Sequence, residues 1–291
     1  MNKIKNNMQI KSVLKFIPVV VYCLLIPIIT YSQTKEARPF VLGMVENLYS
    51  AELGENRILN IYLPAGYNEN DTMKYAVTYL LDGSSDEDFI HIAGLYQFNT
   101  FEWVNRVPAT IVVGIATVDR RRDFTFPTSL EEDKKNYPTT GHSAQFISFI
   151  EKELQPFIDN NYRTTQSKTL IGQSLGGLLA TEILLKKPAL FDNYIIVSPS
   201  LWWDNGSLLN VNSSLLSADY THPTNIYLAA GKEGLSPGQI PRNMIADVNL
   251  LEEKLSTAKN KYLHVYFDYL PNEDHATILH QAVYNAMKIM H

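Results

Sequence analysis

The sequence predicts an α/β fold with a mostly parallel central sheet of about eight strands, helices on both faces and an antiparallel hairpin at the N-terminal edge. Short segments rich in Val, Ile, Tyr and Leu recur along the chain and are typical of strands. Longer segments with helical periodicity lie between most of the later strands. Consecutive strands joined by helices run parallel, because each crossover returns the chain to the same end of the sheet.

The predicted elements follow in chain order. The strands are expected at 43–50, 58–63, 76–81, 110–115, 168–172, 194–197, 225–230 and 263–269, and the helices at 144–160, 175–187, 243–259 and 277–290. Only the turn-rich AELGENR separates the first two strands, so we expect them to pair as an antiparallel hairpin. The stretch 117–141 is long, charged and weakly periodic. We expect it to form a loop over the carboxyl edge of the sheet, where ligands bind in such folds.

The composition is that of a globular protein, with 45% hydrophobic and 19% charged residues in a chain of 291. No internal repeat, low-complexity block or Pro/Ser-rich linker follows Ser32. We therefore expect a single domain over residues 33–291.

Residues 1–32 have the layout of a secretory signal peptide, with four lysines before an apolar run at 16–29 and small residues at the end. This layout predicts cleavage after Ser32 and a secreted or periplasmic protein that does not stay in the membrane. An uncleaved anchor is one alternative, but the run contains two prolines and falls short of the roughly 20 residues that span a bilayer. A lipoprotein signal would use Cys23, but the residue before it is bulkier than such signals prefer.

Cys23 is the only cysteine and would leave with the signal peptide. The mature chain would then have no disulfide, thiol nucleophile or cysteine-based zinc site. Loss of the four lysines changes the formal net charge from −5 to −9. A charge of this sign argues against a nucleic-acid partner.

Ser174 is the central residue of a Gly-x-Ser-x-Gly match, GQSLG at 172–176. The match lies between the predicted strand KTLIG and the predicted helix GGLLATEILLKK. Glycines are needed there, because the serine occupies a strained turn and neighbouring side chains would block its Oγ. The N-terminus of the helix favours a developing oxyanion. We therefore predict that Ser174 is a nucleophile; a glycine-rich turn capped by serine is the alternative.

A serine hydroxyl needs a base, and in this strand–turn–helix context the chain order is serine, acid, histidine. Among the histidines after Ser174, His275 lies in the predicted loop between the last strand and the last helix, at the carboxyl edge of the sheet. His264 falls inside a predicted strand and His280 inside a predicted helix. We predict that His275 is the base; a helix-capping or surface histidine is the alternative.

The acid that orients the imidazole should also lie on a loop at this edge. Glu233 follows a predicted strand in NIYLAAGKEG and is the first choice, with a solvated turn residue as the alternative. Asp204, in SPSLWWDNG, follows the preceding strand and is the second choice, and Asp247 on a predicted helix is the third.

The oxyanion needs two backbone donors, one from the residue after the nucleophile and one from the loop after the third strand. Leu175 N–H is the first candidate. In VTYLLDGSSDED a tight Asp-Gly turn follows the third strand, which makes Ser84 N–H the second. A plain Asp-Gly turn is the alternative.

Several blocks in fixed order resemble the esterase family of α/β-hydrolases, most closely its ferric-siderophore (enterochelin-type) branch. They are IVVGIATVDRRRDFT, FISFIEKELQPFIDNNYRT, TLIGQSLGGLLATEILLKKPALFDNYIIVSPSLWWD and EDHATILHQAVYNAM. The family also holds S-formylglutathione hydrolase, feruloyl esterases and mycolyltransferases. The resemblance covers about residues 43–290. It implies the α/β-hydrolase fold, a serine esterase working through an acyl-enzyme, a small-molecule ester substrate, and no metal or organic cofactor.

The resemblance leaves the ester open. Arg120, Arg121 and Arg122 are candidates for binding an anionic substrate such as a ferric tris-catecholate, and Trp202 and Trp203 for walling the pocket. The alternatives are loop ion pairs for the arginines and ordinary packing for the tryptophans. A carbohydrate esterase acting on feruloyl or acetyl groups of plant polysaccharide and a non-catalytic binding protein on a hydrolase scaffold remain the rival functions.

Overall fold

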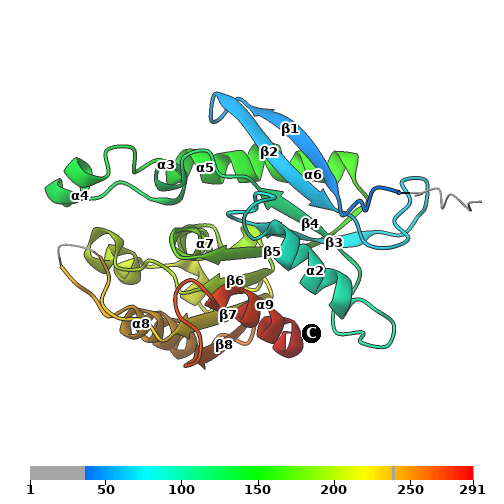
Figure 1. The fold of residues 1–291 in the computed structure, drawn as a ribbon. Helices are drawn as coiled ribbons and strands as arrows, with labels where there is room; N and C mark the ends of the chain where they lie inside the picture. Colours follow the sequence, from blue (N-terminus) through cyan, green and yellow to red (C-terminus); the bar gives the residue numbers. More distant parts are fainter. Residues whose placement is uncertain (1–36, 238–239, 291) are drawn as a thin grey trace, which may run out of the picture. The chain divides into compact units, whose positions relative to one another are not determined.

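Eight strands form one sheet in the computed structural model, which describes residues 37–237 and 240–290 (Figure 1). Their order across the sheet is β1-β2-β4-β3-β5-β6-β7-β8. β1 pairs antiparallel with β2, and β2 antiparallel with β4, whereas all later neighbours run parallel. The predicted mostly parallel sheet with an antiparallel N-terminal hairpin is therefore confirmed.

The elements lie close to their predicted positions. The strands are β1 (Met44–Ser50), β2 (Glu55–Tyr62), β3 (Tyr75–Leu80), β4 (Thr110–Ile115), β5 (Thr164–Gln173), β6 (Asn193–Val197), β7 (Thr224–Gly231) and β8 (Leu263–Leu270). The longer helices are α2 (Phe89–Asn99), α7 (Leu175–Lys186), α8 (Met244–Thr257) and α9 (Ile278–Ile289). The helix predicted at 144–160 consists of α5 (Ser143–Phe149), a π-helical turn η1 (Ile150–Leu154) and α6 (Gln155–Asn161).

Two features differ from the expectation. α2 was not predicted, because Phe89, Ile92, Ala93 and Tyr96 are buried while Ile90 and Phe98 are exposed, so no one-sided apolar stripe marks the helix. The segment expected as a loop at 117–141 contains two short helices, α3 (Arg120–Phe124) and α4 (Glu131–Asn136).

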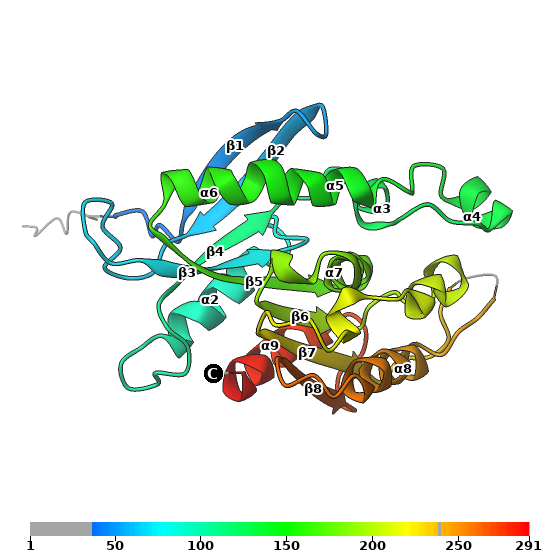
Figure 2. The same ribbon diagram turned by 180° about the vertical axis from the view of Figure 1, so that it is seen from behind.

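Helices cover both faces of the sheet. α2 and α9 pack on one face through buried side chains such as Ile92 and Val283 (Figure 1). α5, α6, α7 and α8 pack on the other face through side chains such as Phe149, Leu178 and Leu251, and Figure 2 shows this side. Helices on both faces keep the parallel strands away from water, which such sheets require.

The sheet and its helices belong to a compact unit that begins at Leu42. The predicted signal peptide, with its cleavage point at Ser32, and Cys23 lie outside the described residues. Within 37–237 and 240–290, none of the helices has the length and apolar character needed to cross a membrane. The carboxyl ends of β5, β6, β7 and β8 meet at one edge of the sheet, and the candidate site is built there.

Candidate active site

Ser174 occupies a sharp turn between β5 and α7. Its φ of +59° lies in the left-handed region, where a residue with a side chain is strained. The turn is held because Ser174 N–H donates to Val197 O (3.0 Å) and Ser200 N–H donates to Ser174 O (2.9 Å). A Cβ on Gly172 would lie 2.4 Å from the carbonyl oxygen of Gly176, so only glycine fits at this position. The strained turn lifts the serine side chain out of the sheet.

His275 and Glu233 extend from this serine as a hydrogen-bonded chain. His275 Nε2 lies 3.0 Å from Ser174 Oγ, and His275 Nδ1 lies 2.8 Å from Glu233 Oε2. The other oxygen of Glu233 accepts hydrogen bonds from the Ser198 hydroxyl and, at 3.4 Å, from Gly231 N–H. The sequence-predicted nucleophile, base and first-choice acid are therefore brought together.

Glu233 is suited to stay ionised beside the imidazole. Burial raises the pKa of its carboxyl group, but the hydrogen bonds from His275 and Ser198 outweigh burial, and the pKa falls below its ordinary value. The side chain is only 4% exposed, so its negative charge is poorly screened by water. An ionised carboxylate at Nδ1 fixes the ring so that Nε2 faces Ser174.

The loops that carry His275 and Glu233 are tied to each other and to β5. Lys232 N–H donates to Glu273 O (2.7 Å), which joins the loop after β7 to the loop after β8. The side-chain amide of Gln173 donates to His275 O, which joins the second loop to the residue before the nucleophile. These bonds fix the spacing between three segments far apart in the chain.

Asp204 and Asp247, the second and third choices for the acid, contact other residues. Asp204 Oδ1 accepts from Ser129 N–H (2.6 Å) and from the hydroxyl groups of Ser129 and Thr128. Asp247 is paired with Arg242. Neither carboxylate is a partner of His275, which faces Glu233.

The backbone around the predicted oxyanion donors is restrained. Leu175 is the first residue of α7, so its N–H is one of the free donors at the helix N-terminus. Gly83 N–H donates to Ile115 O (3.0 Å), and Gly83 O accepts from Asn60 Nδ2 (2.8 Å). Among the described residues no acceptor takes the N–H of Ser84, the next residue. Ser84 N–H thus remains available, but Ser84 lines neither of the cavities described below.

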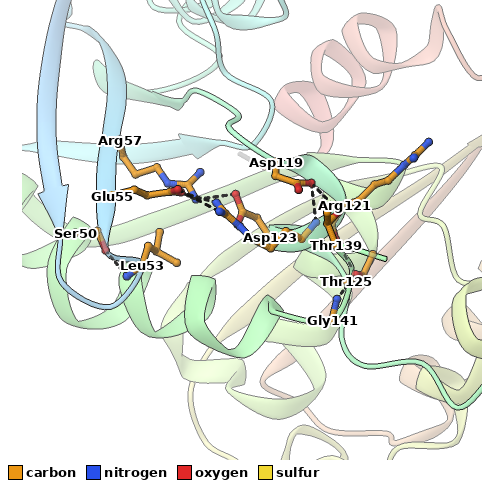
Figure 3. Close-up of polar contacts among 11 residues, drawn as sticks. Ser50, Leu53, Glu55, Arg57, Asp119, Arg121, Asp123, Thr125, Thr139 and Gly141 are labelled. Atoms are coloured by element: carbon orange, nitrogen blue, oxygen red, sulfur yellow. Dashed lines mark hydrogen bonds and ion pairs between the residues drawn. The ribbon is translucent and has the colours of Figure 1, made fainter. Parts of the chain in front are cut away.

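The three consecutive arginines have three different surroundings. Arg120 Nε donates to both oxygens of Asp82 (2.9 and 3.0 Å), and Arg122 pairs with Glu55 and Asp123. These two arginines thus form loop ion pairs, the alternative to the predicted substrate binding. Arg121 makes no ion pair within the part of the chain that the structure describes, and its side chain extends away from Asp119 (Figure 3).

The guanidinium of Arg121 instead lies over the ring of Tyr137, with Cζ 4.8 Å from the ring centroid. Its backbone is fixed, because Arg121 O accepts from the Thr125 hydroxyl (2.7 Å) (Figure 3). The exposed cation is thus held close to an aromatic ring beside the nucleophile.

Two cavities open at the nucleophile and share Ser174, Ser200, Trp202 and Pro237. The larger, of about 480 Å³, is also lined by His275, Glu233, Lys232 and Asp274, and we call it the histidine-side cavity. The smaller, of about 210 Å³, is also lined by Leu175, Arg120, Arg121, Tyr137 and Trp203, and we call it the arginine-side cavity. Arg122 lines neither of them.

The two tryptophans also differ. Trp203 is 1% exposed and donates through Nε1 to Phe126 O (2.8 Å), so it is mainly a core residue that presents part of its surface to the arginine-side cavity. Trp202 is half-buried, lines both cavities and meets Trp203 edge to face. Trp202 and Pro237 therefore form part of the wall that the two cavities share.

Sequence reasoning missed Ser198, Ser200 and Tyr137. The two serines flank Pro199 directly after β6, at the same sheet edge as Ser174. This position after a parallel strand is the feature of the sequence that could have indicated their place in the site. Ser200 Oγ lies 3.4 Å from Ser174 Oγ. Nothing in the sequence near Tyr137 indicates its contact with Arg121. Within residues 37–237 and 240–290, no three His, Cys, Asp or Glu side chains are placed to hold a metal ion.

Comparison with known proteins shows the family to which this chain belongs. The family model named Esterase, described as "Putative esterase", matches residues 50–276. The chain belongs to this family. It is 31% identical over 263 residues to ferri-bacillibactin esterase BesA of Bacillus subtilis, a match that covers 86% of this chain and 90% of that protein.

Solved structures agree with this membership. An IroE-like serine hydrolase from Shewanella oneidensis is 33% identical with a TM-score of 0.75, and the match covers 84% of this chain and 79% of the other. The BES protein from Bacillus cereus is 26% identical with a TM-score of 0.75, covering 88% of this chain and 98% of the other. The chain is therefore a serine esterase with the α/β-hydrolase fold, as its sequence predicts.

Proposed function

We propose that the protein hydrolyses carboxylic esters through a covalent acyl-enzyme, with Ser174 as nucleophile, His275 as general base and Glu233 as the acid that orients His275. One observation carries the proposal: the continuous chain from Ser174 Oγ to His275 Nε2 (3.0 Å) and from His275 Nδ1 to Glu233 (2.8 Å), starting at a strained strand-to-helix turn. Both distances lie within the range for proton transfer without rearrangement.

In the first half of the proposed reaction, His275 Nε2 takes the Ser174 proton while Oγ attacks the ester carbonyl carbon. The carbonyl electron pair moves to oxygen, and the N–H of Leu175 donates to the resulting oxyanion, with the N–H of Ser84 as the sequence-predicted second donor. When the pair returns, the bond to the alcohol oxygen breaks and the imidazolium protonates that oxygen. The negative Glu233 stabilises the imidazolium between these two proton transfers.

In the second half, water takes the place of the alcohol. His275 removes a proton from the water, whose oxygen attacks the acyl carbon, and Ser174 leaves with the proton that His275 returns. The products are a carboxylic acid and an alcohol, and no redox change occurs. The scheme assigns no step to a metal or organic cofactor.

For the substrate, we propose ferric-siderophore lactone esters. One relative supports this choice by its name, ferri-bacillibactin esterase BesA. Arg121, which makes no ion pair among the described residues, supports it physically, because a guanidinium held near aromatic rings suits an anionic aromatic ligand. We further propose that the protein is exported to the periplasm or the medium, which N-terminal sequencing of protein recovered from those fractions would test.

A sugar ester is the second candidate. Of the three consecutive arginines, Arg120 and Arg122 are ion-paired, so Arg121 is the one left for an anion within the part of the chain that the structure describes. The half-buried Trp202 offers a surface on which a sugar ring can stack. A feruloyl or acetyl esterase of plant polysaccharide would use the same triad. A non-catalytic binding protein is disfavoured by the assembled chain of hydrogen bonds at Ser174.

The test compares hydrolysis of a ferric triserine-lactone siderophore and of a feruloylated oligosaccharide by the same protein. We expect a higher kcat/KM on the ferric lactone, and no turnover of either ester by Ser174→Ala. A higher kcat/KM on the sugar ester would keep the triad and replace the substrate. Turnover that persists in Ser174→Ala would overturn the mechanism.

A further inference from the structure

The two cavities at Ser174 are chemically different, and the reaction gives each of them a role. We propose that the arginine-side cavity receives the acid half of the ester and the histidine-side cavity the alcohol half, so that the enzyme selects esters carrying an anionic aromatic group on the acid half. The inference rests on the proposed function and adds Arg121 as the residue that determines this specificity.

The position of the proton donor fixes the alcohol half. The leaving oxygen must take its proton from His275 Nε2, so the alcohol has to lie on the His275 side of Ser174. Of the two cavities, only the larger is lined by His275, and its volume of about 480 Å³ suits the remainder of a large ester.

The position of the oxyanion donor fixes the acid half. The carbonyl oxygen is expected at the N–H of Leu175, which lines the smaller cavity and not the larger one. At the tetrahedral carbon, Oγ, the oxyanion and the leaving oxygen take three positions. The acyl substituent takes the fourth and extends into the remaining cavity, that of about 210 Å³.

The charges of the two cavities agree with this division. No Asp or Glu is among the described residues that line the arginine-side cavity. Arg120 there is neutralised by Asp82, whereas Arg121 makes no ion pair with a described residue. In the histidine-side cavity the cation Lys232 lies with two carboxylates, those of Glu233 and Asp274. An anionic group is therefore favoured on the acid half and not on the alcohol half.

The shape of the arginine-side cavity favours an aromatic anion. Tyr137 lies under the Arg121 guanidinium, its ring centroid is 6.3 Å from that of Trp203, and Trp203 lies 6.2 Å from Trp202. These three neighbouring rings and Ser174 line the same cavity. A flat acyl group can pack against an aromatic ring of this cavity while its negative charge meets Arg121.

Four synthetic esters test the assignment by separating the two halves. The acid-half pair is the methyl ester of N-(para-sulfobenzoyl)serine and its neutral N-benzoyl counterpart. The alcohol-half pair is the O-acetyl ester of N-(para-sulfobenzoyl)serinamide and its neutral N-benzoyl counterpart. Each pair gives a ratio of kcat/KM, anionic over neutral. We expect a ratio of about ten or more for the acid-half pair, as one charged hydrogen bond provides, and a ratio near one for the alcohol-half pair.

Two variants link the acid-half ratio to Arg121. We expect Arg121→Gln to lower it to near one, whereas Lys232→Gln, which removes the cation of the other cavity, leaves it as in the wild type. A ratio near one for the acid-half pair in the wild type, a larger ratio for the alcohol-half pair, or an unchanged ratio in Arg121→Gln would overturn the inference. Failure of the wild type to hydrolyse even the neutral esters in a Ser174-dependent manner would instead count against the proposed function.

Discussion

The buried ion pair between Arg57 and Asp123 joins β2 to α3, the helix that carries the three arginines (Figure 3). Arg57 Nη2 lies 2.7 Å from Asp123 Oδ2, and the two side chains are 0% and 1% exposed. Arg57 Nε and Nη1 have no hydrogen-bond acceptor among the described residues, so the guanidinium depends on Asp123 and Glu55. The substitution Asp123→Asn keeps the shape of the side chain and removes its charge.

Loss of one partner from a buried ion pair costs about 3–5 kcal/mol, because the remaining charge stays in a poorly solvating interior. Glu55 still contacts Arg57 in the variant, so we expect the lower end, about 3 kcal/mol of unfolding free energy. In a domain of this size that loss lowers Tm by about 6–12 °C. Urea and thermal unfolding followed by circular dichroism measure both quantities.

Glu131→Gln is the matched control, since it neutralises an acid in the same segment whose side chain is 87% exposed in its pair with Lys134. We expect that variant to lose no more than about 0.5 kcal/mol, as exposed pairs do. A loss below about 1 kcal/mol in Asp123→Asn, or equal losses in both variants, would refute the reasoning that burial makes the Arg57–Asp123 pair important for the free energy of unfolding.

Three further outcomes are expected. Glu233→Gln should lower kcat by about 10²–10⁴-fold because His275 loses its charged orienter, whereas Asp204→Asn should leave kcat near the wild-type value; equal losses would contradict the assignment. Gly172→Ala should destabilise the protein by about 1–3 kcal/mol, since its Cβ meets a backbone oxygen at 2.4 Å, while Gly94→Ala, whose Cβ meets nothing within 4 Å, should not destabilise it; unfolding in urea compares the two. Burial raises the pKa of Glu55, but the opposing effect of Arg122 and Arg57 is larger, and the pKa falls below 4.5. The stabilisation that ionised Glu55 provides is therefore present above pH 4.5 and is lost as the pH falls through the lowered pKa. Glu55→Gln should make the unfolding free energy depend less on pH in this acidic range, and an unchanged dependence would exclude Glu55 as its source.

The strands could be predicted because each buried strand is a short apolar run between polar turns. β4, predicted at 110–115, spans Thr110–Ile115, and all six residues are buried. β5 begins earlier than predicted, at Thr164, because its first residues are polar and its pairing with β3 decides their conformation. α2 could not be predicted, since apolar residues on its buried and exposed sides hide the helical period.

The same logic applies to the site. Ser174, Glu233 and His275 each follow a strand of a parallel sheet, so chain order alone places them at one edge. The surroundings of the arginines depend on contacts across the fold: Arg120 meets Asp82 after β3, and Arg122 meets Glu55 on β2. No local pattern in the sequence indicates which acid each arginine meets, and this is why only the structure separates Arg121 from its neighbours.

The most direct test of the central claim is covalent labelling of the wild-type protein with a fluorophosphonate, followed by mass spectrometry of the digested chain. We expect a single labelled residue, Ser174, and a labelling rate that falls strongly in His275→Ala, because the serine loses its base. Ser200, whose hydroxyl lies 3.4 Å away, serves as the internal comparison and should stay unlabelled. Folded protein that carries no label on Ser174, or that is labelled there equally fast without His275, would contradict the account.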